Sequence, residues 1–187
     1  FSKRVYKKKI PILTFFTFST ENWKRPKKEI SFLFKLIEDY FNKEINNLKK
    51  NEVKIDILGN LSSLPKKIKS CLNKSMKITK NCKKIRVNLA INYGSKNEIL
   101  NAFKILKKKN TKVSIKAFEK NLYTKALPDP DILIRTGGER RLSNFLLWQL
   151  SYSEIYFVKK LWPDFKVKDF NDILRHFKTV KRNFGKI

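Results

Sequence analysis

Three arginines and a serine near residue 140 are the side chains best suited to chemistry. Arg135, Arg140 and Arg141 lie within seven residues and Ser143 follows them, although only eight of the 44 basic residues are arginines. A guanidinium group can bind phosphate or carboxylate oxygens through two parallel hydrogen bonds, whereas a lysine ammonium acts as a point charge. The local use of arginine therefore indicates an anion site. A solvated basic loop is the alternative that the arginines alone leave open.

The residues around these arginines indicate how they are positioned. Ile132–Ile134 is predicted to be a short strand, Gly137 and Gly138 form a loop that can lie close to a ligand, and residues 145–148 resume an apolar pattern. Glu154 follows among aromatic and aliphatic neighbours. A carboxylate buried in such surroundings must be paired or must bind a cation. Magnesium bridging to a diphosphate is the specific hypothesis.

A second polar group follows the most apolar stretch of the chain. Residues 10–18 (IPILTFFTF) are predicted to form a strand buried on both faces, as in a parallel sheet. Residues 19–25 (STENWKR) come directly after it and offer hydroxyl, amide and guanidinium groups. Open α/β sheets bind ligands beyond the carboxyl ends of their strands. A polar capping loop around a structural tryptophan is the alternative for this segment.

Both segments resemble motifs of the cis-prenyltransferases, the undecaprenyl diphosphate synthase family. The motifs are IRTGGERRLSNFLLWQLSYSEIYF followed by LWPDF, and FSTENWKRPKKE, and the resemblance covers nearly the whole chain. It implies that the diphosphate of isopentenyl diphosphate is bound by Arg135, Arg141 and Ser143, that Leu142 also binds substrate, and that Glu154 belongs to a Mg²⁺ site. Many members have histidine where this chain has Arg140, so the role of that position is open.

The resemblance also implies the reaction and its remaining residues. Isopentenyl diphosphate condenses with an allylic diphosphate, such as farnesyl diphosphate, to give a long-chain cis-polyprenyl diphosphate of the undecaprenyl or dolichol type, and diphosphate is released. Asn22 marks the reaction centre as the candidate catalytic residue, although an amide is a poor base and can serve only to orient. The implied substrate-binding residues of this segment are Ser19, Thr20, Glu21, Trp23 and Arg25.

Strands alternate with helices along the chain, which predicts an α/β protein. We expect a single domain over residues 1–187, with a mostly parallel central sheet flanked by helices and both motifs at its carboxyl edge. Residues 1–8 are predicted to end a short basic helix. The other predicted strands cover residues 53–58 and 85–93, and the predicted helices cover residues 27–50, 65–79, 96–108, 114–122 and 168–182. By resemblance, the first of these helices walls a tunnel for the isoprenoid tail, with Phe32, Phe34 and Phe41 as candidates.

Composition excludes several other classes of protein. Cys71 and Cys82 have neither metal-site nor disulfide spacing, and His176 is the only histidine, so zinc sites and histidine-dependent catalytic triads lose their support. No apolar run approaches the roughly 20 residues that span a bilayer, which leaves a soluble protein or one peripheral to a membrane. The net charge of +28 comes from lysines spread through every segment. Nucleic acid is therefore not the expected partner, and a basic RNA-binding protein remains the alternative.

The resemblance further implies a homodimer, and the apolar product makes peripheral membrane association plausible. Family members carry an aspartate-glycine-asparagine motif upstream of the first segment, and this sequence lacks it. We expect that the 187 residues represent the enzyme incompletely and would be inactive alone. A non-catalytic accessory subunit of a heteromeric prenyltransferase is the alternative, although the retained polar residues of both motifs disfavour it.

Overall fold

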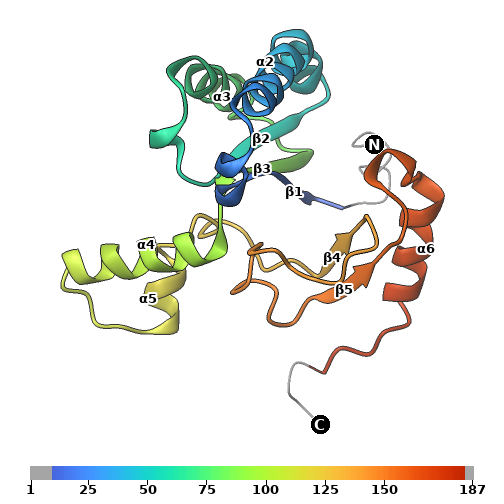
Figure 1. The fold of residues 1–187 in the computed structure, drawn as a ribbon. Coiled ribbons are helices and arrows are strands. Elements are labelled where there is room, and N and C mark those ends of the chain that lie inside the picture. The colour runs from blue at the N-terminus through green and yellow to red at the C-terminus, as the bar shows by residue number, and fades with distance from the viewer. Residues whose placement is uncertain (1–9, 184–187) are drawn as a thin grey trace. The chain divides into compact units, whose positions relative to one another are not determined.

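The computed structural model describes residues 10–183, and its elements are drawn in Figure 1. The internal contacts of the chain group it into two compact units, which meet in the sequence between Ala126 and Leu127. Each unit is described by itself. The predicted α/β class with parallel strands and flanking helices is confirmed. The extent of a single domain over residues 1–187 stays a prediction, and the helix expected at residues 1–8 lies outside the described residues.

The first unit is built on a three-stranded parallel sheet. Its strands are β1 (Ile12–Ser19), β2 (Val53–Leu58) and β3 (Ile85–Tyr93), arranged in the order β1-β3-β2. The central strand β3 has buried residues on both faces, including Val87 and Ala90. Burial on both faces is what a parallel sheet requires, because crossover helices cover it. The strands expected from the sequence are therefore present, within two residues of the expected ends.

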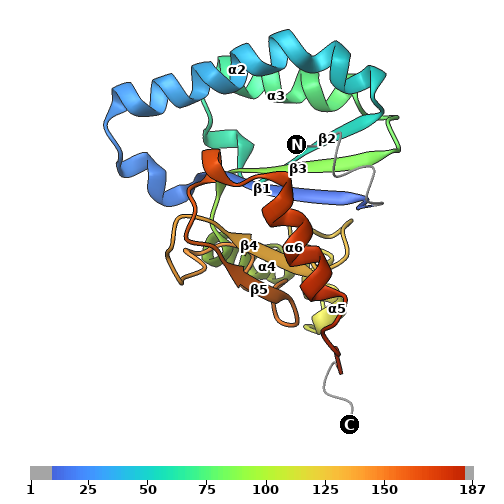
Figure 2. The same cartoon turned by 90° about the vertical axis from the view of Figure 1, so that its right-hand side faces the viewer.

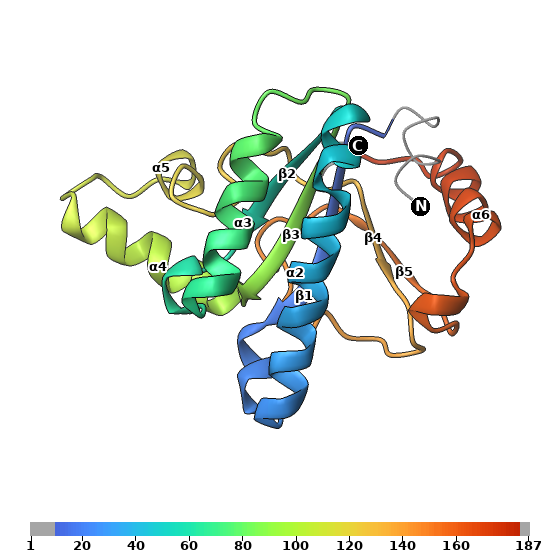
Figure 3. The same cartoon turned by 90° about the horizontal axis from the view of Figure 1, so that it is seen from above.

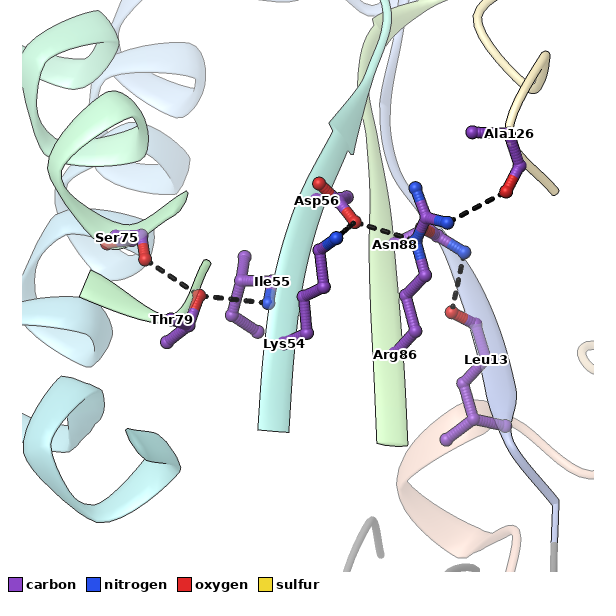
Figure 4. A network of polar contacts seen from close by, with 9 residues as sticks. All are labelled: Leu13, Lys54, Ile55, Asp56, Ser75, Thr79, Arg86, Asn88 and Ala126. Atoms are coloured by element: carbon purple, nitrogen blue, oxygen red, sulfur yellow. Dashed lines mark hydrogen bonds and ion pairs between the residues drawn. The ribbon is translucent and has the colours of Figure 1, made fainter. Parts of the chain in front are cut away.

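Two helices lie side by side over one face of this sheet, as Figures 2 and 3 show. They are α2 (Lys27–Lys50) and α3 (Lys66–Ile78). The buried residues of α2 recur at intervals of four or seven residues, which is the spacing of a helix with one apolar face; they are Ile30, Phe34, Phe41 and Ile45. After α3, Thr79 Oγ1 donates to the Ser75 carbonyl and accepts from the Ile55 amide at 3.1 Å, which ties α3 to β2 (Figure 4).

Polar side chains tie the neighbouring strands together, and Figure 4 shows them from close by. Arg86 Nε donates to Asp56 Oδ2 at 2.6 Å, and its Nη1 donates to the carbonyl of Ala126 at 2.8 Å. The fully buried Asn88 donates to the carbonyl of Leu13 at 3.4 Å. These bonds join β3 to both of its neighbours, so a one-residue slip of either strand would leave polar groups without partners.

Short elements complete the first unit. They are the 3₁₀ turns η1 (Thr20–Lys24) and η2 (Leu61–Ser63), and the helices α4 (Ser95–Lys108) and α5 (Ile115–Glu119). The sequence predicted α5 to reach residue 122. It ends at Glu119 because the chain tightens into turns there, with the amide of Leu122 donating to the Glu119 carbonyl at 3.1 Å.

The second unit contains a two-stranded parallel sheet. Its strands are β4 (Ile132–Arg135) and β5 (Glu154–Phe157), and they are followed by the turn η3 (Trp162–Asp164) and the helix α6 (Val167–Phe177). The sequence predicted α6 to run to residue 182, but it ends at Phe177. Arg182 instead donates to Asp131 and to the carbonyl of Tyr152. Among residues 10–183, no helix is long and apolar enough to cross a membrane.

Candidate functional site: two loops beyond parallel strands

The loop that carries the three arginines begins where β4 ends. The amide of Val158 donates to the carbonyl of Arg135 at 2.8 Å, so the ends of β4 and β5 are held together. Gly137 and Gly138 have φ values of 95° and 79°, and their amides donate to carbonyls of the segment after β5 at 2.8 and 3.0 Å. Both glycines occupy backbone conformations that other residues rarely adopt. The loop is therefore fastened at its base.

The guanidinium group of Arg135 organises this loop from within. Its Nη1 donates to Ser143 Oγ at 2.9 Å and to the backbone carbonyl of Arg141. Its Nε is buried and has no hydrogen-bond partner among the described residues. Arg135 therefore fixes two of the residues predicted to bind the same anion, and it keeps donor capacity that the described protein atoms do not use.

Arg141 is placed differently from Arg135. It forms an ion pair with Glu139, and the two side chains are 62% and 53% exposed. An exposed ion pair of this kind contributes little to stability. The guanidinium group can therefore exchange Glu139 for an incoming anion at small energetic cost. Arg140 is also exposed, and nothing in its surroundings assigns it a role.

Backbone strain marks the segment after Arg141, and the sequence did not predict it. Ser143, Asn144 and Leu146 have φ values of 50°, 62° and 44°, in the left-handed region. Such conformations cost roughly 1–3 kcal/mol each in residues other than glycine and cluster at ligand-binding sites. Leu142 lies directly before this strained stretch and is partly buried. The strain supports the hypothesis that the segment is shaped for a ligand.

Glu154 is the first residue of β5. Its backbone amide donates to the carbonyl of Asp131 at 2.9 Å, and its half-buried carboxylate has no partner among the described residues. Burial, and then the charge of Glu154, raise the pKa of Tyr156. No group of three or more metal-binding side chains is found in residues 10–183. Mg²⁺ commonly binds one or two carboxylates together with phosphate oxygens, so Glu154 fits as a single protein ligand.

The second candidate loop follows β1 and includes η1. Ser19 is buried, and its amide donates to Asn22 Oδ1 at 2.8 Å. This bond engages the oxygen of the Asn22 side chain and leaves its Nδ2 group without a partner among the described residues. Arg25 pairs with Glu29 at 2.7 Å, and both side chains are about half exposed. Asn22 can therefore donate hydrogen bonds to a ligand, and Arg25 can bind an anion. Thr20 and Glu21 lie in η1 between Ser19 and Asn22.

Trp23 is held by three contacts. Its ring packs edge-on against Phe18 and Phe34, with centroid distances of 5.2 and 5.7 Å, and its Nε1 donates to Asn92 Oδ1 at 2.7 Å. Asn92 is a residue to which the sequence assigned no role. Of the three proposed tunnel residues, Phe34 and Phe41 are buried, whereas Phe32 is 60% exposed.

Gly59 brings the end of β2 against the end of β3. Its φ is 131°, and a Cβ atom at this position would lie 2.1 Å from the carbonyl oxygen of Ile91. No side chain fits in that space. The carboxyl ends of the strands in the first unit are thus drawn together next to the loop of residues 19–25.

The predicted residues thus fall into two sets. Ser19 and Arg135 are the last residues of β1 and β4, and residues 20–25 and 136–143 follow them, so each motif lies at the carboxyl end of a parallel strand, as the sequence predicted. Glu154 instead begins β5. These features define an α/β protein in which arginine, hydroxyl and amide groups gather at the ends of parallel strands, where such folds bind phosphorylated ligands.

Comparison with known proteins identifies the family. Residues 1–185 match the family model described as putative undecaprenyl diphosphate synthase. The chain is 42% identical to an isoprenyl transferase of Oceanobacillus iheyensis over 185 residues, which cover 95% of this chain and 73% of that protein. It is 44% identical to an isoprenyl transferase of Rickettsia sibirica over 178 residues, covering 95% and 79%. The chain belongs to the undecaprenyl diphosphate synthase family, the cis-prenyltransferases, and is a transferase.

Solved structures agree with this assignment. A probable undecaprenyl diphosphate synthase from Campylobacter jejuni superposes with a TM-score of 0.91 at 39% identity, covering 99% of this chain and 88% of that one. Lavandulyl diphosphate synthase from Lavandula x intermedia, in complex with dimethylallyl diphosphate, superposes with a TM-score of 0.93 at 31% identity, covering 99% and 83%.

Proposed function

We propose that this protein elongates a prenyl chain in the cis configuration. It condenses isopentenyl diphosphate with an allylic diphosphate such as farnesyl diphosphate and releases diphosphate. The observation that carries the proposal is the loop after β4, in which Arg135 holds both Ser143 and the backbone of Arg141. Family membership supports the reaction class, and the name of the Campylobacter jejuni structure supports a polyprenyl diphosphate product.

The loop after β4 binds the diphosphate of isopentenyl diphosphate in this proposal. Arg141 exchanges its exposed pairing with Glu139 for the phosphate oxygens, and Ser143 Oγ donates a hydrogen bond to them. Leu142 contributes apolar contact beside them. Glu154 holds Mg²⁺, which when bound supplies positive charge to diphosphate oxygens. The charge that develops in the transition state is on the allylic diphosphate, whose C–O bond breaks as the new C–C bond forms, and guanidinium groups and a cation would stabilise it.

The loop after β1 binds the reacting part of the substrates. Arg25 lies two residues before the start of α2 and binds a phosphate group in place of Glu29. The Nδ2 group of Asn22, which has no partner among the described residues, donates a hydrogen bond and orients isopentenyl diphosphate, whose proton passes to the departing diphosphate. It does not act as the base, since its oxygen already accepts the Ser19 amide. Ser19, Thr20 and Glu21 complete this substrate-binding loop.

The apolar tail requires a surface away from water, where each buried methylene contributes about 0.8 kcal/mol. The aromatic cluster of Phe18, Trp23 and Phe34 supports such a surface beside the loop. Phe41 extends the same face of α2, whereas the exposed Phe32 does not belong to it. A homodimer and peripheral binding at a membrane are part of the proposal, because the family resemblance and the apolar product favour them.

The test uses the protein expressed from its complete reading frame. It is incubated with labelled isopentenyl diphosphate, farnesyl diphosphate and Mg²⁺, and butanol-extractable product is measured. We expect long-chain product that disappears with EDTA, and a loss of about 100-fold in kcat/KM for Arg141→Ala and for Glu154→Ala. Arg175→Ala is the matched control, because Arg175 also forms an exposed ion pair, with Asp172 on α6.

A folded, complete chain without product would contradict the proposal and favour the accessory-subunit alternative. Equal activity of Arg141→Ala and Arg175→Ala would contradict the assignment of the loop after β4 as the site that binds the diphosphate of isopentenyl diphosphate. The chain length of the product follows from the same extract by chromatography.

A further inference from the structure

We propose that Asn92 is a positioning residue, which fixes Trp23 and through it the loop of residues 19–25. Asn92 is the residue before the last in β3, and its side chain is 5% exposed. It belongs neither to the loop nor to the residues proposed to touch substrate. The catalytic role of the loop of residues 19–25 rests on the proposed function. The structural part rests on contacts within the first unit alone.

The side-chain amide of Asn92 uses both of its ends. Its Oδ1 accepts from Trp23 Nε1 at 2.7 Å, and its Nδ2 donates to the carbonyl of Asn60 at 2.7 Å and to Ser63 Oγ at 2.8 Å. An indole N–H can only donate and a backbone carbonyl can only accept, so the orientation of the amide is fixed by chemistry. One side chain therefore joins η1, the turn at η2 and the end of β3.

The backbone conformation of Asn92 suits its role in positioning Trp23. Its φ is 50°, in the left-handed region, where asparagine is one of the few residues found routinely. Its carbonyl accepts the amide of Asn60 at 3.3 Å, and the same carbonyl lies 3.0 Å from where a Cβ of Gly59 would be. The turn after β2 therefore packs against the backbone of Asn92. This contact restrains the residue whose side-chain amide binds Trp23.

Trp23 transmits this restraint to the loop. Its ring is 39% exposed, so packing against Phe18 and Phe34 covers only part of it, and the hydrogen bond to Asn92 fixes its rotation. Asn22 is its direct neighbour in η1. A rotation of the indole would therefore shift the amide that orients substrate, and a shift of 1 Å in such a group can cost about 100-fold in rate.

The first test is spectroscopic and independent of turnover. In ¹⁵N-labelled protein, the indole N–H resonance of Trp23 is identified with Trp23→Phe. Asn92→Gly keeps the left-handed backbone but removes all three hydrogen bonds, and we expect it to speed exchange of that N–H about 5- to 10-fold and to shift the amide resonances of residues 20–25. Asn92→Asp keeps the acceptor for the Trp23 indole N–H but loses the donor to the Asn60 carbonyl, so it should retain part of the protection. Asn110→Gly is the matched control, since Asn110 has a φ of 47° and is exposed.

The second test is kinetic. For Asn92→Gly we expect kcat to fall about 10- to 100-fold, with the KM for isopentenyl diphosphate changed less than about 2-fold because other residues bind it. Asn92→Asp should recover part of kcat, and Asn110→Gly should match the unsubstituted protein. A merely structural defect would not separate kcat from KM in this way.

Three outcomes are distinguishable. If Asn92→Gly leaves indole exchange and the loop resonances as they are in Asn110→Gly, the hydrogen-bonded link is wrong. If exchange accelerates but kcat is unchanged, Asn92 does not position the loop for catalysis. If the unsubstituted protein has no activity, the proposed function fails, while the exchange experiment still decides whether Asn92 holds Trp23.

Discussion

Arg135 and Arg141 have the same side chain but different physical roles. Arg135 binds its own loop and is partly buried, so its removal would disorganise the residues around it as well as remove a charge. Arg141 is exposed, and among residues 10–183 its side chain pairs only with Glu139, so its removal should leave the loop in place. A kinetic loss in an Arg141 variant is therefore easier to assign to binding than the same loss in an Arg135 variant.

Gly59→Ala should destabilise the protein by about 2–4 kcal/mol, because the new Cβ meets the Ile91 carbonyl and φ is unfavourable. Gly137→Ala is the matched control. It also has a positive φ, but no atom lies within 4 Å of the new Cβ, so only about 1 kcal/mol of backbone strain is expected. The midpoints of urea unfolding measure both changes. Equal losses would show that the contact with Ile91 is not decisive.

Single residues were predictable where residue type alone carries the chemistry. The cluster of arginines and the polar run of residues 19–25 could be found in the sequence because guanidinium, hydroxyl and amide groups follow directly after strand-like apolar runs there. The hydrogen bond between Trp23 and Asn92 could not, since 69 residues separate the two. The left-handed conformation of Leu146 also depends on tertiary packing, and its residue type does not predict it.

At the scale of elements, long periodic segments were predicted well and short ones poorly. Helix α2 has the expected bounds because its apolar residues repeat over 24 residues. Strand β5 was missed. It has four residues, and its two apolar positions Ile155 and Phe157 are 38% and 40% exposed, so no alternation of buried apolar and exposed polar residues marks it.

The two faces of α2 provide a direct test of its packing. Phe34 is buried and contacts the rings of Phe18 and Trp23, so Phe34→Ala should cost about 3–5 kcal/mol in the free energy of unfolding. Phe32 lies on the same helix but is 60% exposed, and Phe32→Ala should change stability by less than about 0.5 kcal/mol. Chemical denaturation checks both, and a large loss in the Phe32 variant would contradict the assignment of the faces.

The start of α6 should make stability depend on pH. A hydrogen bond from Lys160, and then one from the amide of Lys166, lower the pKa of Asp169 below its usual value. A lowered pKa in the folded state gives a stabilisation that is present above the unfolded pKa of about 3.9. That stabilisation is lost as the pH falls through the folded pKa.

The Tm of the unsubstituted protein should therefore exceed that of Asp169→Asn at about pH 6, and the difference should vanish in strong acid, below both pKa values. Thermal unfolding at a series of pH values measures it. Asp164→Asn serves as a control, because Asp164 is an aspartate that lies nearby in η3. A difference that persisted in strong acid would exclude the charge of Asp169 as its cause.

At the scale of the whole molecule, the α/β class follows from the alternation of strand-like and helix-like segments, and the sequence was enough to predict it. The grouping of contacts into two units, which meet after Ala126, was not predictable. No change in composition marks that boundary, and the lysines run through both units.

The strand order β1-β3-β2 also governs how the protein can form as it is synthesised. Both β1 and β2 pair only with β3 in this sheet, and β3 is the last of the three to leave the ribosome. The apolar strand β1 therefore cannot pair until β3 has been synthesised and Ile12 can lie opposite Arg86, its partner in the register. Until then a nascent chain exposes an aggregation-prone segment. We therefore expect that β1 avoids aggregation during synthesis only if chaperones bind it or if α2 packs against it early.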